Sequence, residues 1–336
     1  MASDNADWLA LTQEEALEPD LPICDPHHHL WEARTGYVQP RYLLDDVLED
    51  LTGGHNVVST VFIECGAMFR TQGPEDMRPV GETEFVADIA AMSAAGGTAR
   101  VAAGIVGTAY LDRGDSAAAV LDAQIEAGQG RFRGIRQGVT WHESAQVPNH
   151  RTAPPPGLYD SAGFRAGLAH LAPRGLTFEL WCYHTQLDEA ERLVRDFPDQ
   201  TFILDHFGGP LGIGPYAGRA DEVFADWCRA VAPVAACPNV MAKLGGLAME
   251  VNGFGWHERP RPPTSQELMA ASRRYYDTAL ELFGTDRCLF ESNFPVEKVS
   301  CSYTVLWNAF KRLTASFSAA EKAALYHDNA AYLYRV

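Results

Sequence analysis

The feature that most constrains the fold is a regular alternation of short apolar runs with stretches of helical spacing. Eight runs of strand length are bounded by turn residues, near 22–26, 57–65, 101–107, 132–138, 176–182, 201–205, 239–244 and 287–291. Apolar residues recur at amphipathic-helix intervals in the stretches 42–51, 84–94, 116–127, 163–171, 187–195, 223–231 and 267–283. This order predicts a parallel sheet with crossover helices.

The number and character of the runs favour a closed barrel. They are continuously apolar, as in VVSTVFI at 57–63, which is typical of strands covered on both faces. Eight units fit a (β/α)8 barrel better than an open doubly wound sheet, and no G-x-G-x-x-G follows the first strand. We expect an α/β protein with a single TIM barrel over residues 22–336 and an N-terminal extension over residues 1–21.

Charge excludes some classes of partner. The chain has 27 Lys and Arg against 44 Asp and Glu, a formal net charge of −17, which repels polyanions. We therefore expect a small-molecule substrate and neither nucleic acid nor membrane as partner. No residue specifies an oligomer, although many barrels of this size self-associate, so a homo-oligomer stays open.

Seven scattered cysteines form no C-x-x-C pair, and residues 1–22 lack the basic and apolar regions of a signal peptide. These features predict reduced thiols and a cytoplasmic protein.

Three segments after strands are longer than a compact barrel needs: 66–82, 142–160 and 245–265. In a barrel these segments lie at the carboxyl ends of the strands, where active sites form. Long loops there predict a covered pocket.

Histidines follow three of the predicted strands. The first strand ends in Asp25-Pro26-His27-His28-His29-Leu30-Trp31, and residues two apart in an extended segment face the same side, so His27 and His29 can point together into the barrel. Two convergent imidazoles can hold a divalent metal such as Zn²⁺ or bind a substrate carbonyl. His184 and His206 end the fifth and sixth strands. As members of one set, they are candidates for the group that deprotonates water.

Two cations also end strands. Arg136 ends the fourth and can hold a carboxylate in a bidentate fork or pair with a neighbouring acid. Lys243 ends the seventh inside an apolar run, where an ammonium group needs a partner, either substrate or acid. Either cation could stabilise a developing oxyanion.

Polar residues are dense after the second strand, where Glu64, Arg70 and Arg78 form either a substrate clamp or a rim of ion pairs, the arginines pairing with Glu82 or Glu84. Trp31 and Tyr183 would add aromatic walls suited to a ring-shaped substrate.

These motifs together resemble the amidohydrolase superfamily, and more narrowly its amidohydrolase-2 group of sugar lactonases, 2-pyrone-4,6-dicarboxylate lactonase and several decarboxylases. The resemblance runs from about residue 22 to the C-terminus. It rests on D-x-H-x-H-x-W at 25–31, F-R-G-I-R at 132–136, Y-H at 183–184, D-H-x-G-G-P at 205–210, K-L-G-G-L at 243–247 and S-N-F-P at 292–295.

The resemblance implies a distorted TIM barrel that hydrolyses an ester, lactone or amide. In metal-dependent members, two histidines of the first strand and one of the fifth bind a divalent ion, which corresponds here to His27, His29 and His184. The family usually shows G-S-D-x-P at the eighth strand, where this chain has Glu291-Ser292-Asn293-Phe294-Pro295. Asn293 cannot take a proton as a carboxylate does. Either Glu291 or a histidine replaces it as the base, or the site works without a tightly held metal, as in some lactonases of the group.

The favoured function is hydrolysis of a small carbonyl compound, a lactone or cyclic ester from aromatic or sugar catabolism, with a histidine as base and Asn293 as a hydrogen-bonding group. The cofactor is either a divalent metal, with Zn²⁺ the first choice, or none. One alternative is non-oxidative decarboxylation of an aromatic acid, and another is a degenerate barrel that only binds a ligand.

Overall fold

The computed structural model describes residues 5–97 and 99–336, so residues 1–4 of the expected extension lie outside the described residues. Its centre is one sheet of eight parallel strands in the order β1 to β8. The strands are β1 (Pro22–His28), β2 (Asn56–Ile63), β3 (Arg100–Gly107), β4 (Phe132–Arg136), β5 (Thr177–Leu180), β6 (Phe202–Leu204), β7 (Val240–Leu244) and β8 (Cys288–Phe290).

The sheet closes at the carboxyl ends of its first and last strands. Each strand pairs with the next in the chain, and the remaining gap is bridged where His28 pairs with Phe294. The backbone N–H of Asn293 donates to the carbonyl of His27 at 2.9 Å, and that of His29 donates to Phe294 at 2.8 Å. The expected TIM barrel is confirmed, and its closure lies directly beside the first-strand histidines.

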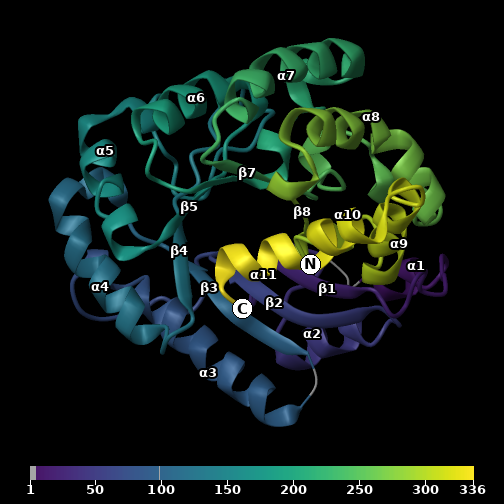
Figure 1. Ribbon diagram of the computed structural model, residues 1–336, viewed down its shortest axis with the longest axis horizontal. Helices are drawn as coiled ribbons and strands as arrows, with labels where there is room; N and C mark the ends of the chain where they lie inside the picture. The colour runs from purple at the N-terminus through teal and green to yellow at the C-terminus, as the bar shows by residue number, and fades with distance from the viewer. Residues whose placement is uncertain (1–4, 98) are drawn as a thin grey trace.

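Helices form a ring around the barrel (Figure 1). The seven stretches with helical spacing all contain helices: α2 (Leu44–Leu51), α3 (Val80–Gly96), α4 (Ala117–Ala127), α5 (Ala162–Leu168), α6 (Leu187–Asp196), α7 (Ala220–Ala235) and α8 (Ser265–Phe283). Four more had not been assigned from the spacing: α1 (Ala6–Leu9), α9 (Tyr303–Leu313), α10 (Ala319–Ala323) and α11 (Asn329–Tyr334).

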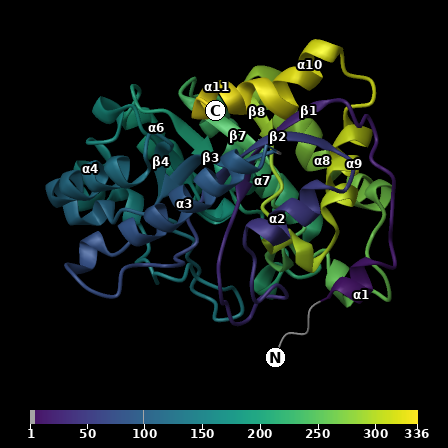
Figure 2. The same cartoon turned by 90° about the horizontal axis from the view of Figure 1, so that it is seen from below.

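The C-terminal helices cover one end of the barrel (Figure 2). Asn329 in α11 donates to the carbonyls of Thr285 and Cys288, at the start of β8, at 2.8 Å each. Tyr334 is buried among side chains of β2 and β3. This end holds the amino ends of the strands, so the carboxyl ends at the opposite side are left for a site.

The described part of the expected extension packs on the outer helices. Glu14 accepts hydrogen bonds from Ser265 in α8 and Asn308 in α9. The boundary between extension and barrel stays a prediction. No helix of the described chain is long and apolar enough to cross a membrane.

Candidate active site

Three histidine rings converge at the carboxyl end of the barrel. His27 lies in β1, His29 directly follows it, and His206 comes after β6. The ring centroid of His27 lies 4.9 Å from that of His29 and 4.5 Å from that of His206. His28 faces the opposite way, and its Nε2 lies 2.9 Å from Thr60 Oγ1. The alternation of an extended segment therefore puts His27 and His29 on one side, as expected.

Glu291, which directly follows β8, links two of these rings. Its Oε1 lies 2.6 Å from His206 Nδ1, and its Oε2 lies 2.7 Å from His27 Nδ1. All three side chains are buried. The bond to Glu291 fixes a hydrogen on Nδ1 of His206, so in the neutral ring Nε2 is an acceptor.

His27 lies deeper, between two fixed cations. Its Nε2 lies 3.2 Å from Arg136 Nη1, and its Nδ1 lies 3.3 Å from Lys243 Nζ. Burial, and then the charge of Lys243, hold the pKa of His27 well below its usual range. The ring is therefore neutral at physiological pH.

Lys243 is buried in β7 and paired with two acids. Its Nζ lies 2.7 Å from Glu179 Oε2 and 3.3 Å from Asp205 Oδ1. Burial raises the pKa of Glu179 well above its ordinary value although Lys243 opposes the shift. Burial acts in the same direction on Asp205, but Lys243 and Arg136 outweigh it and lower the pKa. Acids, and not a substrate, thus supply the partner that the sequence required for Lys243.

Arg136, the last residue of β4, is held on several sides. Its Nε lies 2.8 Å from Glu64 Oε1, its Nη2 lies 2.6 Å from the Glu64 carbonyl oxygen, and its Nη1 lies 3.2 Å from Asp205 Oδ2. Together with the contact to His27, these use four of its five N–H groups. Glu64 also pairs with Arg151, and the two arginines outweigh burial in lowering the pKa of Glu64.

Asn293 contacts His29. His29 Nδ1 lies 2.8 Å from the carbonyl oxygen of Ile63, so Nδ1 carries the hydrogen and Nε2 is an acceptor. Burial, and then Arg136, hold the pKa of His29 well below its usual range. Asn293 Oδ1 lies 3.2 Å from that Nε2, while Asn293 Nδ2 is buried without a partner. As placed, two acceptors face each other and a buried N–H group has no partner. Exchanging the amide oxygen and nitrogen removes both problems, because Nδ2 then donates to His29 Nε2 and Oδ1 takes the unpartnered position.

A cavity of about 200 Å³ opens above this cluster. The predicted loop at 142–160 contributes four lining residues and the predicted loop at 245–265 contributes one, so these two loops do border the pocket. The lining residues are His29, Arg34, Tyr37, Cys65, Arg136, Thr140, Pro148, Asn149, His150, Arg151, Trp181, Tyr183, His206, Met249, Asn293 and Val296.

His184 does not join the histidine set, contrary to the sequence prediction. Its Nδ1 accepts from the backbone N–H of Leu211 at 3.3 Å, and its ring packs against Tyr216 with centroids 5.2 Å apart. The strand ends four residues earlier, at Leu180, and His184 is the first residue of a short 3-10 helix that follows. Trp181, directly after the strand, takes the place facing the cavity and contacts the His206 ring at 4.8 Å.

The other predicted residues divide into cavity walls and surface groups. Tyr183 lines the cavity and donates to the carbonyl of Pro148 at 2.5 Å, whereas Trp31 is buried behind it and stacks on His29. Arg70 forms an exposed pair with Glu84, the rim alternative. Arg78 is exposed and does not line the cavity.

Sequence reasoning missed Arg34, His150, Arg151 and Trp181. Three of these lie in loops, and the rule that favours strand ends does not select loop residues. For His150 and Arg151, the available signal was the length of the loop at 142–160.

The residues that could hold a metal ion are His27, His206 and Glu291, whose ligand atoms lie within 4.8 Å of one another. Imidazole nitrogens and a carboxylate are donors that Zn²⁺ accepts. Glu291 Oε2 is buried without a hydrogen bond of good geometry, which suits an oxygen facing a cation. The donor set thus fits a divalent ion, although it differs from the expected set of His27, His29 and His184.

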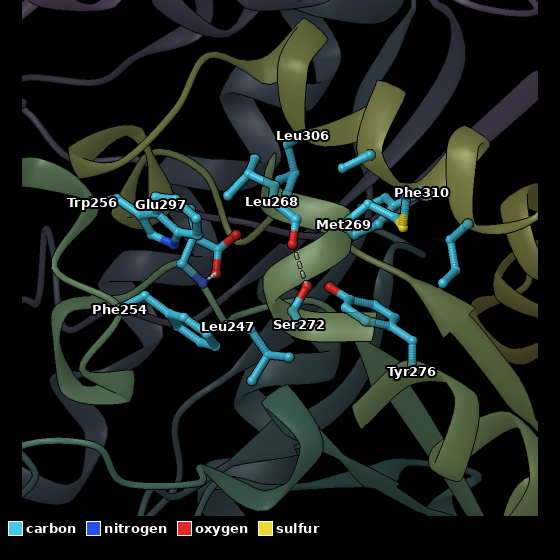
Figure 3. A pocket seen from close by; sticks show the side chains of 13 residues that line it. Leu247, Phe254, Trp256, Leu268, Met269, Ser272, Tyr276, Glu297, Leu306 and Phe310 are labelled. Atoms are coloured by element: carbon cyan, nitrogen blue, oxygen red, sulfur yellow. Dashed lines mark hydrogen bonds between the residues drawn. The ribbon is translucent and has the colours of Figure 1, made fainter. Parts of the chain in front are cut away.

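A second cavity, between the loop after β7 and helices α8 and α9, has a different character (Figure 3). Its volume is about 20 Å³, room for about one water molecule, and its walls are mainly apolar. The carboxyl group of Glu297 faces it among Phe254, Trp256 and Leu268. This space is too small for a substrate.

The barrel, with imidazoles and carboxylates gathered at the carboxyl ends of its strands, defines the class of (β/α)8-barrel enzymes. A profile of the family described as Amidohydrolase matches residues 24–336, and the chain therefore belongs to the amidohydrolase family of hydrolases.

Relatives by sequence include lactonases. The chain is 33% identical over 335 residues to an uncharacterised protein of Sinorhizobium fredii, a match that covers 94% of this chain and 99% of the relative. It is 30% identical over 176 residues to an L-fucono-1,5-lactonase of Burkholderia multivorans, covering 52% of this chain and 56% of the lactonase.

Solved structures share the fold. An amidohydrolase from Burkholderia multivorans with bound zinc has a TM-score of 0.71 at 24% identity, covering 94% of this chain and 99% of its own. A 5-carboxyvanillate decarboxylase from Novosphingobium aromaticivorans, complexed with manganese, has a TM-score of 0.61 at 12% identity, covering 97% and 99%.

Proposed function

We propose that this amidohydrolase hydrolyses a lactone, with His206 as general base. The observation that carries the proposal is the contact of 2.6 Å between His206 Nδ1 and Glu291 Oε1. A buried carboxylate that orients an imidazole stabilises the imidazolium formed when Nε2 takes a proton. The relatives named as lactonases support the same reaction.

In the proposed reaction, a water molecule in the cavity attacks the lactone carbonyl carbon as His206 Nε2 takes its proton. The carbonyl oxygen, which becomes negative, receives the remaining Nη2–H of Arg136. The carbon bond to the ring oxygen then breaks, and His206 returns the proton to that oxygen. One lactone and one water thus give one hydroxy acid.

A divalent ion held by His27, His206 and Glu291, for which we propose zinc, would polarise the carbonyl and lower the pKa of water to about 7. It would engage the histidine and carboxylate that the proton transfer uses. We therefore assign the base role of His206 to the protein without metal.

The test is acid release from a panel of lactones, including L-fucono-1,5-lactone. We expect His206→Gln and Glu291→Gln to lower kcat by about 100-fold or more with little change in KM, because a positioned base contributes about 10²–10⁴. His184→Gln is the matched control and should retain full activity. If wild type hydrolyses no lactone, or if His184→Gln is the variant that loses activity, the proposal is wrong.

Decarboxylation of an aromatic acid is a second candidate, because three arginines line the cavity and could hold a carboxylate. A decarboxylase neighbour by fold keeps this candidate open. Release of CO₂ from aromatic carboxylic acids, without a ring-opened acid, would favour it. Ligand binding without either reaction would indicate a degenerate barrel.

A further inference from the structure

The charged side chains that line the cavity among the described residues are all arginines: Arg34, Arg136 and Arg151. No aspartate, glutamate or lysine belongs to this described lining. The whole chain carries a formal net charge of −17, so the cavity is a cationic spot in an acidic protein. A concave cationic site raises the local concentration of anions.

Two of the three arginines already have carboxylate partners. Arg136 and Arg151 both pair with Glu64, and Arg136 also pairs with Asp205. The pKa of Glu64 is lowered because Arg151 and Arg136 outweigh burial, and that of Asp205 is lowered because Lys243 and Arg136 do so, which means that both acids are ionised. A substrate carboxylate would have to compete with them.

Arg34 differs from the other two. The one hydrogen bond of its side chain to a described residue runs from Nη2 to the carbonyl oxygen of Cys65, at 2.6 Å. In the described part of the chain no carboxylate forms an ion pair with it within 4.0 Å. The guanidinium instead lies against two aromatic rings, 4.9 Å from the centroid of Trp31 and 4.8 Å from that of Tyr37.

These contacts fix the guanidinium without neutralising it. Aromatic faces hold a planar cation in place, while Nε and Nη1 keep their N–H groups for a further acceptor. A preorganised guanidinium loses little side-chain entropy when it binds a planar anion. Arg34 lines the same cavity as His206, so one ligand can reach both.

We propose that Arg34 binds a carboxylate of the substrate, so that the enzyme acts on lactones that carry an acidic group besides the reacting ester. The inference rests on the proposed lactonase activity and names its substrate class. It assigns to Arg34 the role that the sequence had suggested for Arg136.

Three lactones with the same ring configuration provide the kinetic test. L-fucono-, L-galactono- and L-galactaro-1,5-lactone differ in the substituent on ring carbon 5, which is a methyl, a hydroxymethyl and a carboxylate group respectively. We expect wild type to prefer the carboxylate. Arg34→Gln should raise KM for that lactone by about 10- to 100-fold and change the other two by less than about 3-fold, since charge-assisted hydrogen bonds are the strong ones.

Two further variants control for charge and for folding. Arg34→Lys keeps the charge without the planar fork and should fall between wild type and Arg34→Gln. Arg273→Gln removes an exposed arginine of α8 that pairs with Asp277, and it should leave kcat and KM unchanged for all three lactones. If Arg34→Gln slows all three lactones equally, the proposal is overturned.

Calorimetry separates this proposal from the lactonase activity. Galactarate, an open-chain dicarboxylate, should bind wild type at least 10-fold more tightly than Arg34→Gln. If wild type binds galactarate more tightly in this way but hydrolyses no lactone, the role of Arg34 is supported and the proposed lactonase activity is rejected. Equal affinities would overturn the role of Arg34 even if lactones are hydrolysed.

Discussion

Gly246 passes directly beneath His206: a Cβ on Gly246 would lie 2.4 Å from both Cγ and Nδ1 of the imidazole ring. The φ of Gly246 is +79°, in the left-handed region, and the φ of His206 is +52°. A side chain at residue 246 would thus be strained and would also displace the ring. Gly246 is what allows the His206 ring to reach Glu291.

Gly246→Ala should therefore lower kcat by about 10-fold or more and lower the unfolding midpoint by several degrees, since overpacking costs about 1–3 kcal/mol. Steady-state kinetics and thermal unfolding measure the two effects. Gly96→Ala is the control, because a Cβ there meets nothing within 4 Å and the φ is not positive. Normal activity in Gly246→Ala would contradict the required close approach.

Glu297 should make stability depend on pH. Burial raises its pKa to about 8, and only its Oε1 has a hydrogen-bond donor, the N–H of Ala248 at 2.9 Å. The folded protein binds this proton more tightly than the unfolded chain, in which the carboxyl has its ordinary pKa of 4.5. The contribution is full below about pH 4.5 and is lost as the pH rises through about 8, at a slope of about 1.4 kcal/mol per pH unit.

Urea unfolding of wild type and Glu297→Gln at several pH values between 5 and 8.5 isolates this group. The amide cannot ionise but can still accept from Ala248 in the apolar surroundings of Figure 3. We expect the stability of wild type relative to the variant to fall steadily across the range. A difference independent of pH would mean that Glu297 is ionised in the folded protein.

Removal of metal should leave the activity nearly intact. After chelation, with the loss of metal checked by metal analysis, kcat should stay within about 2-fold of its starting value. Added Zn²⁺ should inhibit the enzyme, because the ion would occupy His206 and Glu291. Loss of activity on chelation, with recovery on addition of Zn²⁺, would instead make these residues working metal ligands.

Asn293→Asp is the matched variant for the metal experiment. It places a carboxylate, a better ligand for such ions than an amide, 3.2 Å from His29 Nε2. Zn²⁺ content after purification should rise above that of wild type. Equal metal content in both proteins would show that Asn293 does not limit metal binding.

Much of the fold could be predicted because it depends on local periodicity. The eight apolar runs match β1 to β8 within a few residues, and the seven stretches with helical spacing match α2 to α8. The helices α9 to α11 were not predicted from the sequence. Tyr334 covers the barrel through contacts with strands more than two hundred residues earlier, and a local pattern does not report such contacts.

The convergence of two histidine rings could be predicted because side-chain direction follows from strand geometry. His27 and His29 lie two residues apart in an extended segment, and they converge. His184 was misplaced because its strand ends at Leu180 and His184 belongs to the 3-10 helix that follows, where the alternation of side-chain directions in a strand no longer applies.

The sequence by itself determined the barrel and the paired histidines of the first strand, since both depend on residue type and short spacing, while the replacement of an acid by Asn293 followed from the family resemblance. Only the tertiary structure decided that Glu291 holds His206, that Asp205 neutralises Lys243, and that Arg34 lies beside the same cavity with no carboxylate partner among the described residues. The physical reason is that these contacts join residues far apart in the chain, and their electrostatic free energy depends on distances and burial that exist only in the folded protein.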